Sequence, residues 1–153
     1  MIFLVTVLVI IFDQLSKFIL SNYLTLYKSV PVIKNIFHLT LVHNTGIAFG
    51  MFKGNSGIIL LVTILGLIII IYYLKKDFFS NSHHARIPFF DKLSVGFILG
   101  GAIANMVDRI RLGYVIDFLD FRVWPVFNLA DSCITIGAVI LIFKTFFPIK
   151  SKN

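Results

Sequence analysis

The stretch Leu93–Ile110, LSVGFILGGAIANMVDRI, decides the fold. It carries no charge until its last three residues, and ~20 mostly apolar residues are the length that a helix needs to cross a bilayer. Gly96, Gly100 and Ala104 recur at intervals of four, a spacing of small residues that lets membrane helices approach closely. The stretch therefore predicts a membrane-spanning helix that packs tightly on a neighbour, with Gly101 continuing the same small face.

The composition of the whole chain supports a membrane protein. Of its 153 residues, 58% are hydrophobic and 14% are charged, well below the charge of an ordinary soluble domain. The net charge of +7 would suggest nucleic acid in a soluble protein. Here the basic residues lie mostly in loops between apolar runs, where membrane topology and lipid headgroups explain them. We therefore expect no nucleic-acid partner, and the single cysteine, Cys133, excludes an internal disulfide.

Four apolar runs are long enough to span a bilayer. The first could be read as a cleaved signal peptide, but no basic residue precedes it and no small-residue cleavage site follows it. We therefore expect an all-α membrane protein with four transmembrane helices in one domain, residues 1–153, with spans at about residues 2–20, 57–74, 93–110 and 126–147.

The loops predict the orientation and a small sheet. Lys and Arg are more frequent in the loop 75–92 and the C-terminal tail than on the other side, which favours cytoplasmic termini. The loop 25–56 would then lie on the extracytoplasmic side of the membrane. Its segments Pro31–Ile33 and Ile36–His43 often alternate apolar and polar residues, which predicts an antiparallel β cradle on the extracytoplasmic face. Residues 111–125 are expected to form a short aromatic connection.

Charged and amide side chains gather at one end of the four expected spans. A charge within a span is costly and marks a functional site by default. In an up-down-up-down arrangement, the end of the first span, the end of the third and the start of the fourth meet on one side. The polar residues at this end are Asp13, Lys17, Asn105, Asp108, Arg109, Asp117, Asn128 and Asp131.

Aspartates are the candidate catalytic groups. Two neighbouring carboxylates cannot both ionise easily, so the pair shares one proton. One member can then activate water while the other donates a proton to a peptide carbonyl, as in aspartic proteases. This chemistry needs no metal and no cofactor, and we expect neither. From spacing alone, either Asp108 or Asp117 could be the partner of Asp131.

Other catalytic motifs fit less well. The chain has no Glu and hence no His-Glu-x-x-His metal motif. Gly54–Gly57, GNSG, is similar to the serine motif of rhomboid peptidases, but no His lies in any expected span to act as its base. Ser16 and Lys17 are adjacent, and adjacent helix residues do not face each other.

Two non-catalytic functions are the alternatives. A proton or ion carrier would need polar residues through the whole membrane thickness, and the second run has none. A structural scaffold would have little reason to gather polar residues at one end. For single residues, Asp13 and Lys17 could equally be a structural i, i+4 ion pair, and Asn128 could be a helix N-cap.

Five blocks of the sequence resemble one family in order. This resemblance covers essentially the whole chain and points to lipoprotein signal peptidase (signal peptidase II). The blocks are Asp13–Lys17 (DQLSK), His43–Phe49 (HNTGIAF), Gly100–Arg109 (GGAIANMVDR), Val115–Phe118 (VIDF) and Phe127–Asp131 (FNLAD).

The resemblance implies an aspartic endopeptidase of the bacterial inner membrane. It would remove signal peptides from prolipoproteins by cleaving before the diacylglyceryl-modified cysteine. Asp117 and Asp131 would form the catalytic dyad, with Asp108 as the runner-up. The remaining residues that the resemblance assigns to substrate binding or support are Asp13, Asn44, Gly46, Asn105, Asp108, Arg109 and Asn128.

The resemblance also implies the partners of the chain. They are a lipid-modified prolipoprotein, membrane lipid and globomycin-type peptide inhibitors, and the enzyme is expected to be a monomer. Phe118, Phe121 and Trp124 are expected to anchor the chain at the membrane interface, with a clamp on the substrate's lipid as the alternative.

Overall fold

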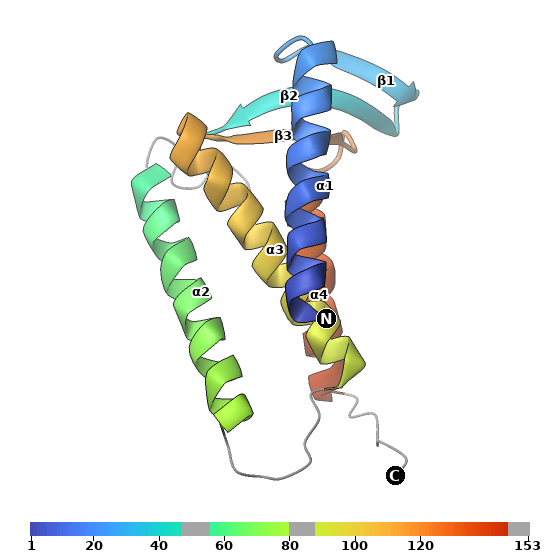
Figure 1. The fold of residues 1–153 in the computed structure, drawn as a ribbon. Helices are drawn as coiled ribbons and strands as arrows, with labels where there is room; N and C mark the ends of the chain where they lie inside the picture. The colour runs from blue at the N-terminus through green and yellow to red at the C-terminus, as the bar shows by residue number, and fades with distance from the viewer. Residues whose placement is uncertain (47–55, 80–87, 147–153) are drawn as a thin grey trace.

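The computed structural model describes residues 1–46, 56–79 and 88–146, so residues 47–55 of the expected outer loop and 80–87 of the expected cytoplasmic loop lie outside the described part. The protein is mostly helical and carries one small antiparallel sheet, as expected (Figure 1). Its elements are α1 (Ile2–Tyr23), β1 (Ser29–Ile33), β2 (Phe37–Asn44), α2 (Ser56–Phe79), α3 (Phe89–Leu112), β3 (Val115–Asp120) and α4 (Leu129–Phe146).

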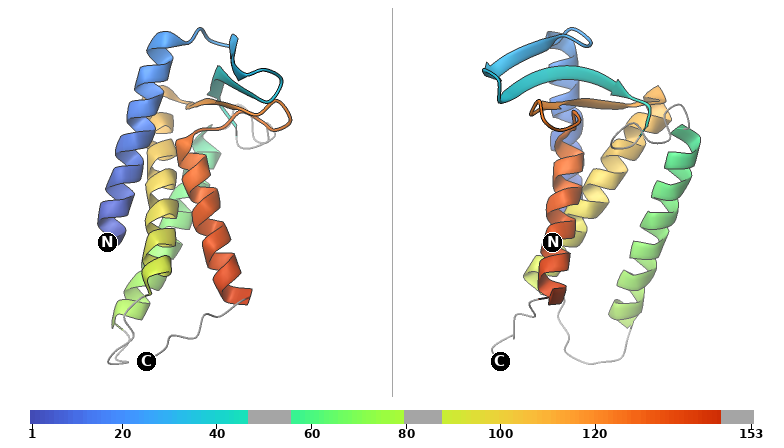
Figure 2. Two further views of the ribbon diagram at one scale, coloured as in Figure 1. Left: turned by 90° about the vertical axis from the view of Figure 1, so that its right-hand side faces the viewer. Right: turned by 180° about the vertical axis from the view of Figure 1, so that it is seen from behind.

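The helices pack side by side beneath the sheet. α3 packs against both α1 and α4, and α2 stands on the outer side of α3 (Figures 1 and 2). α1 and α3 end at the sheet, and α2 and α4 begin there (Figure 1). This is the up-down-up-down order that brings the polar ends of three helices together. α4 begins at Leu129 rather than at residue 126, because Asn128 caps it.

The close approach of α1 and α3 depends on two glycines. A Cβ atom at Gly100 would lie 2.7 Å from Cβ of Val9, and one at Gly96 would lie 2.7 Å from Cβ of Val5. The small-residue spacing thus predicts this contact correctly. Gly101 does not continue the same face, since one residue turns a helix by about 100°.

Gly101 packs on α4 instead. A Cβ atom at this position would meet the backbone of Ala130 and lie 2.7 Å from Cγ1 of Ile134. On α4, Gly137 has the matching role, because its Cβ would lie 2.7 Å from the carbonyl oxygen of Ser94. α3 can therefore pack closely against both α1 and α4, because small residues lie on two of its faces.

Apolar side chains cover the outside of the helices. Among the described residues, α1 and α3 are long and apolar enough to cross a membrane, and α2 contributes the shorter apolar stretch Gly57–Ile70. Phe3 and Phe18 on α1 are 82% and 68% exposed. Exposed apolar surface in water costs about 25 cal/mol per Å². Hydrocarbon chains of a membrane therefore suit this surface better than water does.

The sheet has three strands in the order β1-β2-β3, and all pairs are antiparallel. β1 and β2 lie where the sequence predicts strands. β3 lies within the connection 111–125, which was expected to be short and aromatic, and no strand was predicted there. Its two aspartates, Asp117 and Asp120, are both buried but point to opposite faces, so no apolar-polar alternation marks the strand.

Candidate active site

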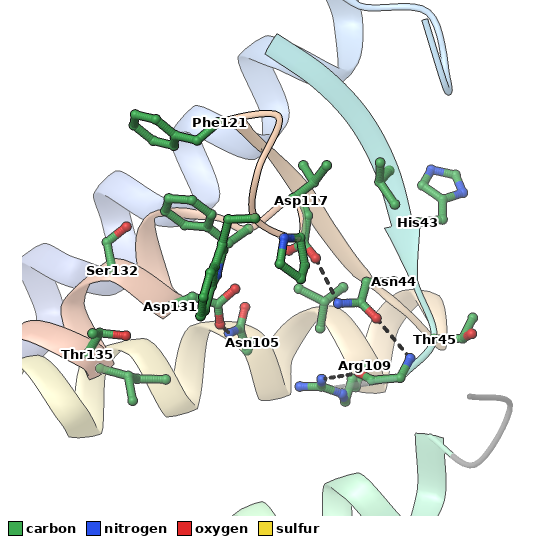
Figure 3. A pocket seen from close by; sticks show the side chains of 18 of the residues that line it. His43, Asn44, Thr45, Asn105, Arg109, Asp117, Phe121, Asp131, Ser132 and Thr135 are labelled. Atoms are coloured by element: carbon green, nitrogen blue, oxygen red, sulfur yellow. Dashed lines mark hydrogen bonds between the residues drawn. The ribbon is translucent and has the colours of Figure 1, made fainter. Parts of the chain in front are cut away.

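Asp117 and Asp131 reach one pocket from two different elements. Asp117 lies in the middle of β3, and Asp131 lies in the first turn of α4. Both side chains line a pocket of about 960 Å³ (Figure 3). The sequence predicted that they converge, and the fold brings them together because α4 begins directly beside β3.

Asn128 bridges the two carboxylates. Its Nδ2 donates a hydrogen bond to Oδ1 of Asp117 at 2.7 Å, and its Oδ1 accepts the backbone N–H of Asp131 at 2.8 Å. The second bond is a helix N-cap, and Oδ2 of Asp131 accepts the backbone N–H of Asn128 in return at 3.4 Å. The cap that starts α4 is thus the same residue that connects the two aspartates.

Two further amides hold one carboxylate each. Asn44, at the end of β2, donates from Nδ2 to Oδ2 of Asp117 at 2.8 Å. Asn105, on α3, donates from Nδ2 to Oδ1 of Asp131 at 2.8 Å. Each aspartate therefore accepts hydrogen bonds from two partners, which fixes its orientation.

Arg109 holds the end of β2. Its Nη2 donates to the carbonyl oxygen of Gly46 at 3.1 Å, and the backbone N–H of Gly46 donates to Oδ1 of Asn44 at 2.9 Å (Figure 3). Arg109 also lines the pocket with Asn44 and Gly46. The three residues form a chain from α3 to Asp117.

The environment of Asp117 favours its protonated form. Burial, followed by the negative charge of Asp131, raises the pKa of Asp117 to about 7. Hydrogen bonds from Asn44 and Asn128 and the positive charge of Lys17 oppose this rise. The pair can therefore retain one proton near neutral pH, as a general acid beside a general base requires.

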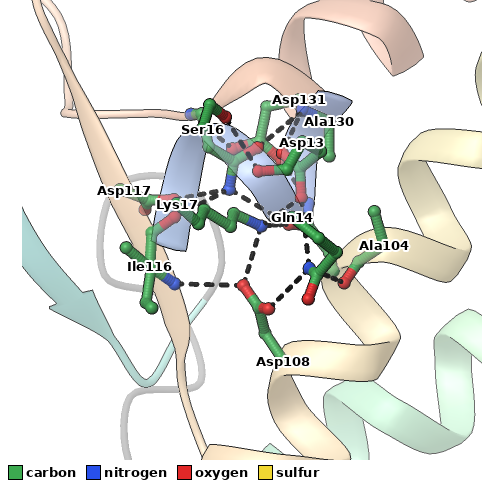
Figure 4. A network of polar contacts seen from close by, with 12 residues as sticks. Asp13, Gln14, Ser16, Lys17, Ala104, Asp108, Ile116, Asp117, Ala130 and Asp131 are labelled. Atoms are coloured by element: carbon green, nitrogen blue, oxygen red, sulfur yellow. Dashed lines mark hydrogen bonds and ion pairs between the residues drawn. The ribbon is translucent and has the colours of Figure 1, made fainter. Parts of the chain in front are cut away.

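A second polar network surrounds Lys17, next to Asp117 and Asp131. Nζ of Lys17 lies 2.7 Å from Oδ2 of Asp13, 2.7 Å from Oδ2 of Asp108 and 3.0 Å from Oδ1 of Asn105 (Figure 4). Lys17 is 2% exposed, and a buried cation needs such partners. The ion pair suggested by the i, i+4 spacing of Asp13 and Lys17 is confirmed.

Asp108 faces this network. It accepts a hydrogen bond from Nε2 of Gln14 at 2.8 Å and one from the backbone N–H of Ile116 at 3.3 Å, besides its ion pair with Lys17. It thus connects α1 and β3 to α3. The pocket side of β3 carries Asp117, which makes Asp117 the better geometric partner for Asp131.

Comparison with known proteins assigns the chain to a family. The family model described as Signal peptidase (SPase) II matches residues 5–147. The chain belongs to the signal peptidase II family. It is therefore an aspartic-type peptidase that removes signal peptides from prolipoproteins.

Individual signal peptidase II relatives match over most of their length. A lipoprotein signal peptidase of Halothermothrix orenii is 43% identical over 93% of this chain and 92% of the relative. One from Moorella thermoacetica is 43% identical over 95% and 92% of the two chains. A solved structure described as a bacterial membrane enzyme superimposes with a TM-score of 0.81 at 31% identity, covering 99% of this chain and 93% of the other.

Some residues around the pocket could not be identified from the sequence. Gln14, which donates to Asp108, lies in the DQLSK block. Its polar side chain within an apolar span was the signal that could have identified it. Thr40 and Asp120 share a buried hydrogen bond of 2.6 Å, which no motif indicates.

The aromatic residues divide into two groups. Phe121 and Trp124 line the pocket beside Phe127, whereas Phe118 is 4% exposed inside the sheet. The prediction that Phe118 anchors the membrane interface is therefore wrong.

Among the described residues, no three His, Cys or Asp side chains are grouped as a metal site.

Proposed function

We propose that the enzyme cleaves prolipoproteins immediately before the diacylglyceryl-modified cysteine, with Asp117 and Asp131 as its catalytic dyad. One observation carries the assignment: the buried carboxylate of Asp117 and the half-buried carboxylate of Asp131 face one pocket and are bridged by Asn128. No nucleophilic side chain is required, because a water molecule between the carboxylates supplies the attacking oxygen.

The two aspartates have different roles. Asp131 lies in the first turn of α4, where the helix dipole favours a negative charge. It acts as the general base. Asp117, whose pKa lies near 7 because of burial and the neighbouring Asp131, carries the shared proton and acts as the general acid.

The reaction then follows in two steps. Asp131 takes a proton from water, the water oxygen bonds to the carbonyl carbon before the cysteine, and Asp117 gives its proton to the carbonyl oxygen. The tetrahedral intermediate collapses when the carbon–nitrogen bond breaks. A proton from Asp131 goes to the leaving amine, and Asp117 recovers one from the intermediate's hydroxyl, so the dyad returns to its starting state.

Neighbouring residues orient the substrate and the dyad. Asn44, Gly46 and Arg109 form the polar rim of the pocket at the end of β2. Asn105 and Asn128 hold the carboxylates, while Asp13 and Asp108 support them through Lys17. The apolar side of the pocket, formed by Val126, Ile134 and Ile136 among others, suits an apolar signal peptide.

We further propose that all four helices span the bacterial inner membrane as one domain, residues 1–153. α2 and α4 carry exposed apolar side chains like those of α1, with Ile68 56% and Phe143 59% exposed. α1 begins and α4 ends far from the sheet (Figure 1). Together with the Lys and Arg bias of the loops, this supports cytoplasmic termini and an extracytoplasmic active site.

The pocket also suits peptide inhibitors of the globomycin type, which would compete with the prolipoprotein. Every group of the proposed site comes from a single chain, which supports a monomeric enzyme.

The test is cleavage of a diacylglyceryl-modified prolipoprotein peptide by purified enzyme in detergent, comparing wild type with Asp117→Asn and Asp131→Asn. Asn retains the shape and loses the titratable proton. Both variants should remain folded by circular dichroism and lose at least about a thousandfold in kcat, since each removes the acid or the base. Asp91→Asn, whose carboxylate pairs with Lys144 at the far end of α3 and α4, is the matched control. An active Asp117→Asn alongside an inactive Asp108→Asn would overturn the dyad assignment.

A further inference from the structure

β2 and β3 do not match residue for residue. Asp117 and Asp120 are three positions apart on β3, so they point to opposite faces of the sheet. Their partners on β2, Val42 and His38, are four positions apart and would share a face in a regular strand. The mismatch is resolved by a register shift between Leu39 and Val42.

The shift is a β-bulge. Leu39 pairs with Leu119 and Val42 with Asp117, so Thr40 and Leu41 together stand opposite the single residue Phe118. One extra residue on one strand moves every side chain that follows it on that strand to the opposite face of the sheet.

The bulge is what points Asn44 towards the dyad. Asn44 lies two positions beyond Val42 and therefore shares the face of Asp117, to which it donates its 2.8 Å hydrogen bond. In a regular β2 strand paired at His38 and Asp120, Asn44 would point to the opposite face. Asp117 would then lose one of its two amide donors.

A buried hydrogen bond fixes the bulge. Thr40 lies within it and is 9% exposed, and its Oγ1 donates to Oδ2 of Asp120 at 2.6 Å. Asp120 is 4% exposed and also accepts the backbone N–H and Nη1 of Arg122, both at 2.9 Å. Burial raises the pKa of Asp120, but hydrogen bonds from Thr40 and Arg122 outweigh it and hold the pKa below its usual range. Asp120 is therefore an ionised and strong acceptor at neutral pH.

We propose that Thr40 and Asp120 are positioning residues for the reaction, because their hydrogen bond fixes the bulge that turns Asn44 towards Asp117. This inference rests on the proposed role of Asp117. It assigns a function in catalysis to two side chains that lie on the face of the sheet opposite the dyad.

A purely structural role is the competing explanation, and the pH profile separates the two. The hydrogen bond from Asn44 lowers the pKa of Asp117, so losing it raises that pKa further. The alkaline limb of the pH profile of kcat, where kcat falls as pH rises, should then move to higher pH. Among the residues that the structure describes, the other charged groups that act on Asp117 are Asp131 on α4, Lys17 on α1 and Arg109 on α3, and none of them is changed by a substitution at Thr40.

The experiment compares Thr40→Val with Thr40→Ser, Asn44→Ala and Ser29→Ala in the full-length enzyme. Thr40→Val removes the hydroxyl at nearly constant volume, whereas Thr40→Ser keeps it. We expect Thr40→Val to lower kcat by roughly ten- to a hundredfold, the range for a lost hydrogen bond to a charged group. The alkaline side of its pH profile should move to higher pH, and that of Asn44→Ala should move in the same direction. Thr40→Ser should restore both the rate and the limb.

Ser29→Ala is the matched control. Oγ of Ser29 lies 3.0 Å from Oγ1 of Thr40, so the substitution removes a neighbour of the hydroxyl and leaves its bond to Asp120. It should keep the wild-type pH profile. Should Thr40→Val fail to fold, Thr40→Ala removes the same hydroxyl with a smaller side chain and serves in its place.

The outcomes are distinct from those of the dyad test. If the Thr40 variant unfolds at a lower temperature but keeps the wild-type kcat and the wild-type alkaline limb of the pH profile, Thr40 is merely structural and the inference is wrong. The inference also fails if Asp117→Asn is inactive while the Thr40 variant is unaffected. An active Asp117→Asn would instead overturn the dyad itself.

Discussion

Asp13 on α1 accepts the backbone N–H of Ala130, the second residue of α4, at 2.8 Å. A buried carboxylate of the first helix thus caps the last one, beside the turn that carries Asp131. The other oxygen of Asp13 pairs with Lys17 at 2.7 Å. The position of the proposed base is therefore set by a residue more than a hundred positions earlier in the chain.

Replacing Asp13 should disturb both stability and activity. Asp13→Ala leaves the N–H of Ala130 and one side of Lys17 without their buried partner, and each such loss costs about 1–3 kcal/mol. We expect a clear drop in the thermal midpoint in detergent and a lower kcat, because the first turn of α4 can then shift. Ser16→Ala is the control, since Ser16 lies one turn along α1 and bonds only the local carbonyl of Asp13 among its described contacts. Equal midpoints for the two variants would contradict the capping role.

Replacing Lys17 should destabilise the whole fold. Lys17→Met leaves Asp13 and Asp108 buried without their cation, and breaking a buried ion pair on one side costs about 3–5 kcal/mol. The free energy of unfolding, measured by denaturant titration in mixed micelles, should fall by that amount. Adding Asp108→Asn to Lys17→Met should recover part of the loss, because one unpaired charge is then removed. Lys28→Met, at an exposed position, should have no comparable effect.

The α1–α3 contact should tolerate no added side chain at Gly100. Gly100→Ala brings a Cβ atom within 2.7 Å of Cβ of Val9, and such overpacking costs about 1–3 kcal/mol. The thermal midpoint should fall. Gly66 on α2 is the matched control, because a Cβ there meets nothing within 4 Å and Ala favours a helix. A Gly100→Ala variant that is as stable as Gly66→Ala would show that the helices can separate freely.

The helices and the composition of the site could be predicted from the sequence, because apolar length and helical spacing are local signals. The spans expected at about 2–20 and 93–110 correspond to α1 (Ile2–Tyr23) and α3 (Phe89–Leu112). Asn105 and Asp108 share a face at i, i+3, as the spacing predicts. The choice between Asp108 and Asp117 could not be made in this way, because it depends on which side of β3 each carboxylate reaches.

The parts that escaped prediction are non-local. β3 is recognisable by its pairing with β2, whereas its own pattern places buried acids on both faces. The bulge at Thr40 follows from the register of two strands that are about seventy residues apart in the chain. Such features arise from tertiary contacts, which a single sequence does not display.

The pH profile is the most direct test of the proposed dyad. Burial and the charge of Asp131 raise the pKa of Asp117 to about 7, so its proton is present below that pH and lost above it. When both carboxylates are ionised, none can protonate the peptide carbonyl. We therefore expect kcat to fall roughly tenfold per pH unit above about pH 7 and to fall again in acid, where the base is protonated. The measurement is kcat for the lipid-modified peptide from pH 4 to 10, with Asp91→Asn as a control that should keep the wild-type limbs. A profile that stays flat through neutral pH into the alkaline range, with folding intact, would exclude a shared proton on Asp117.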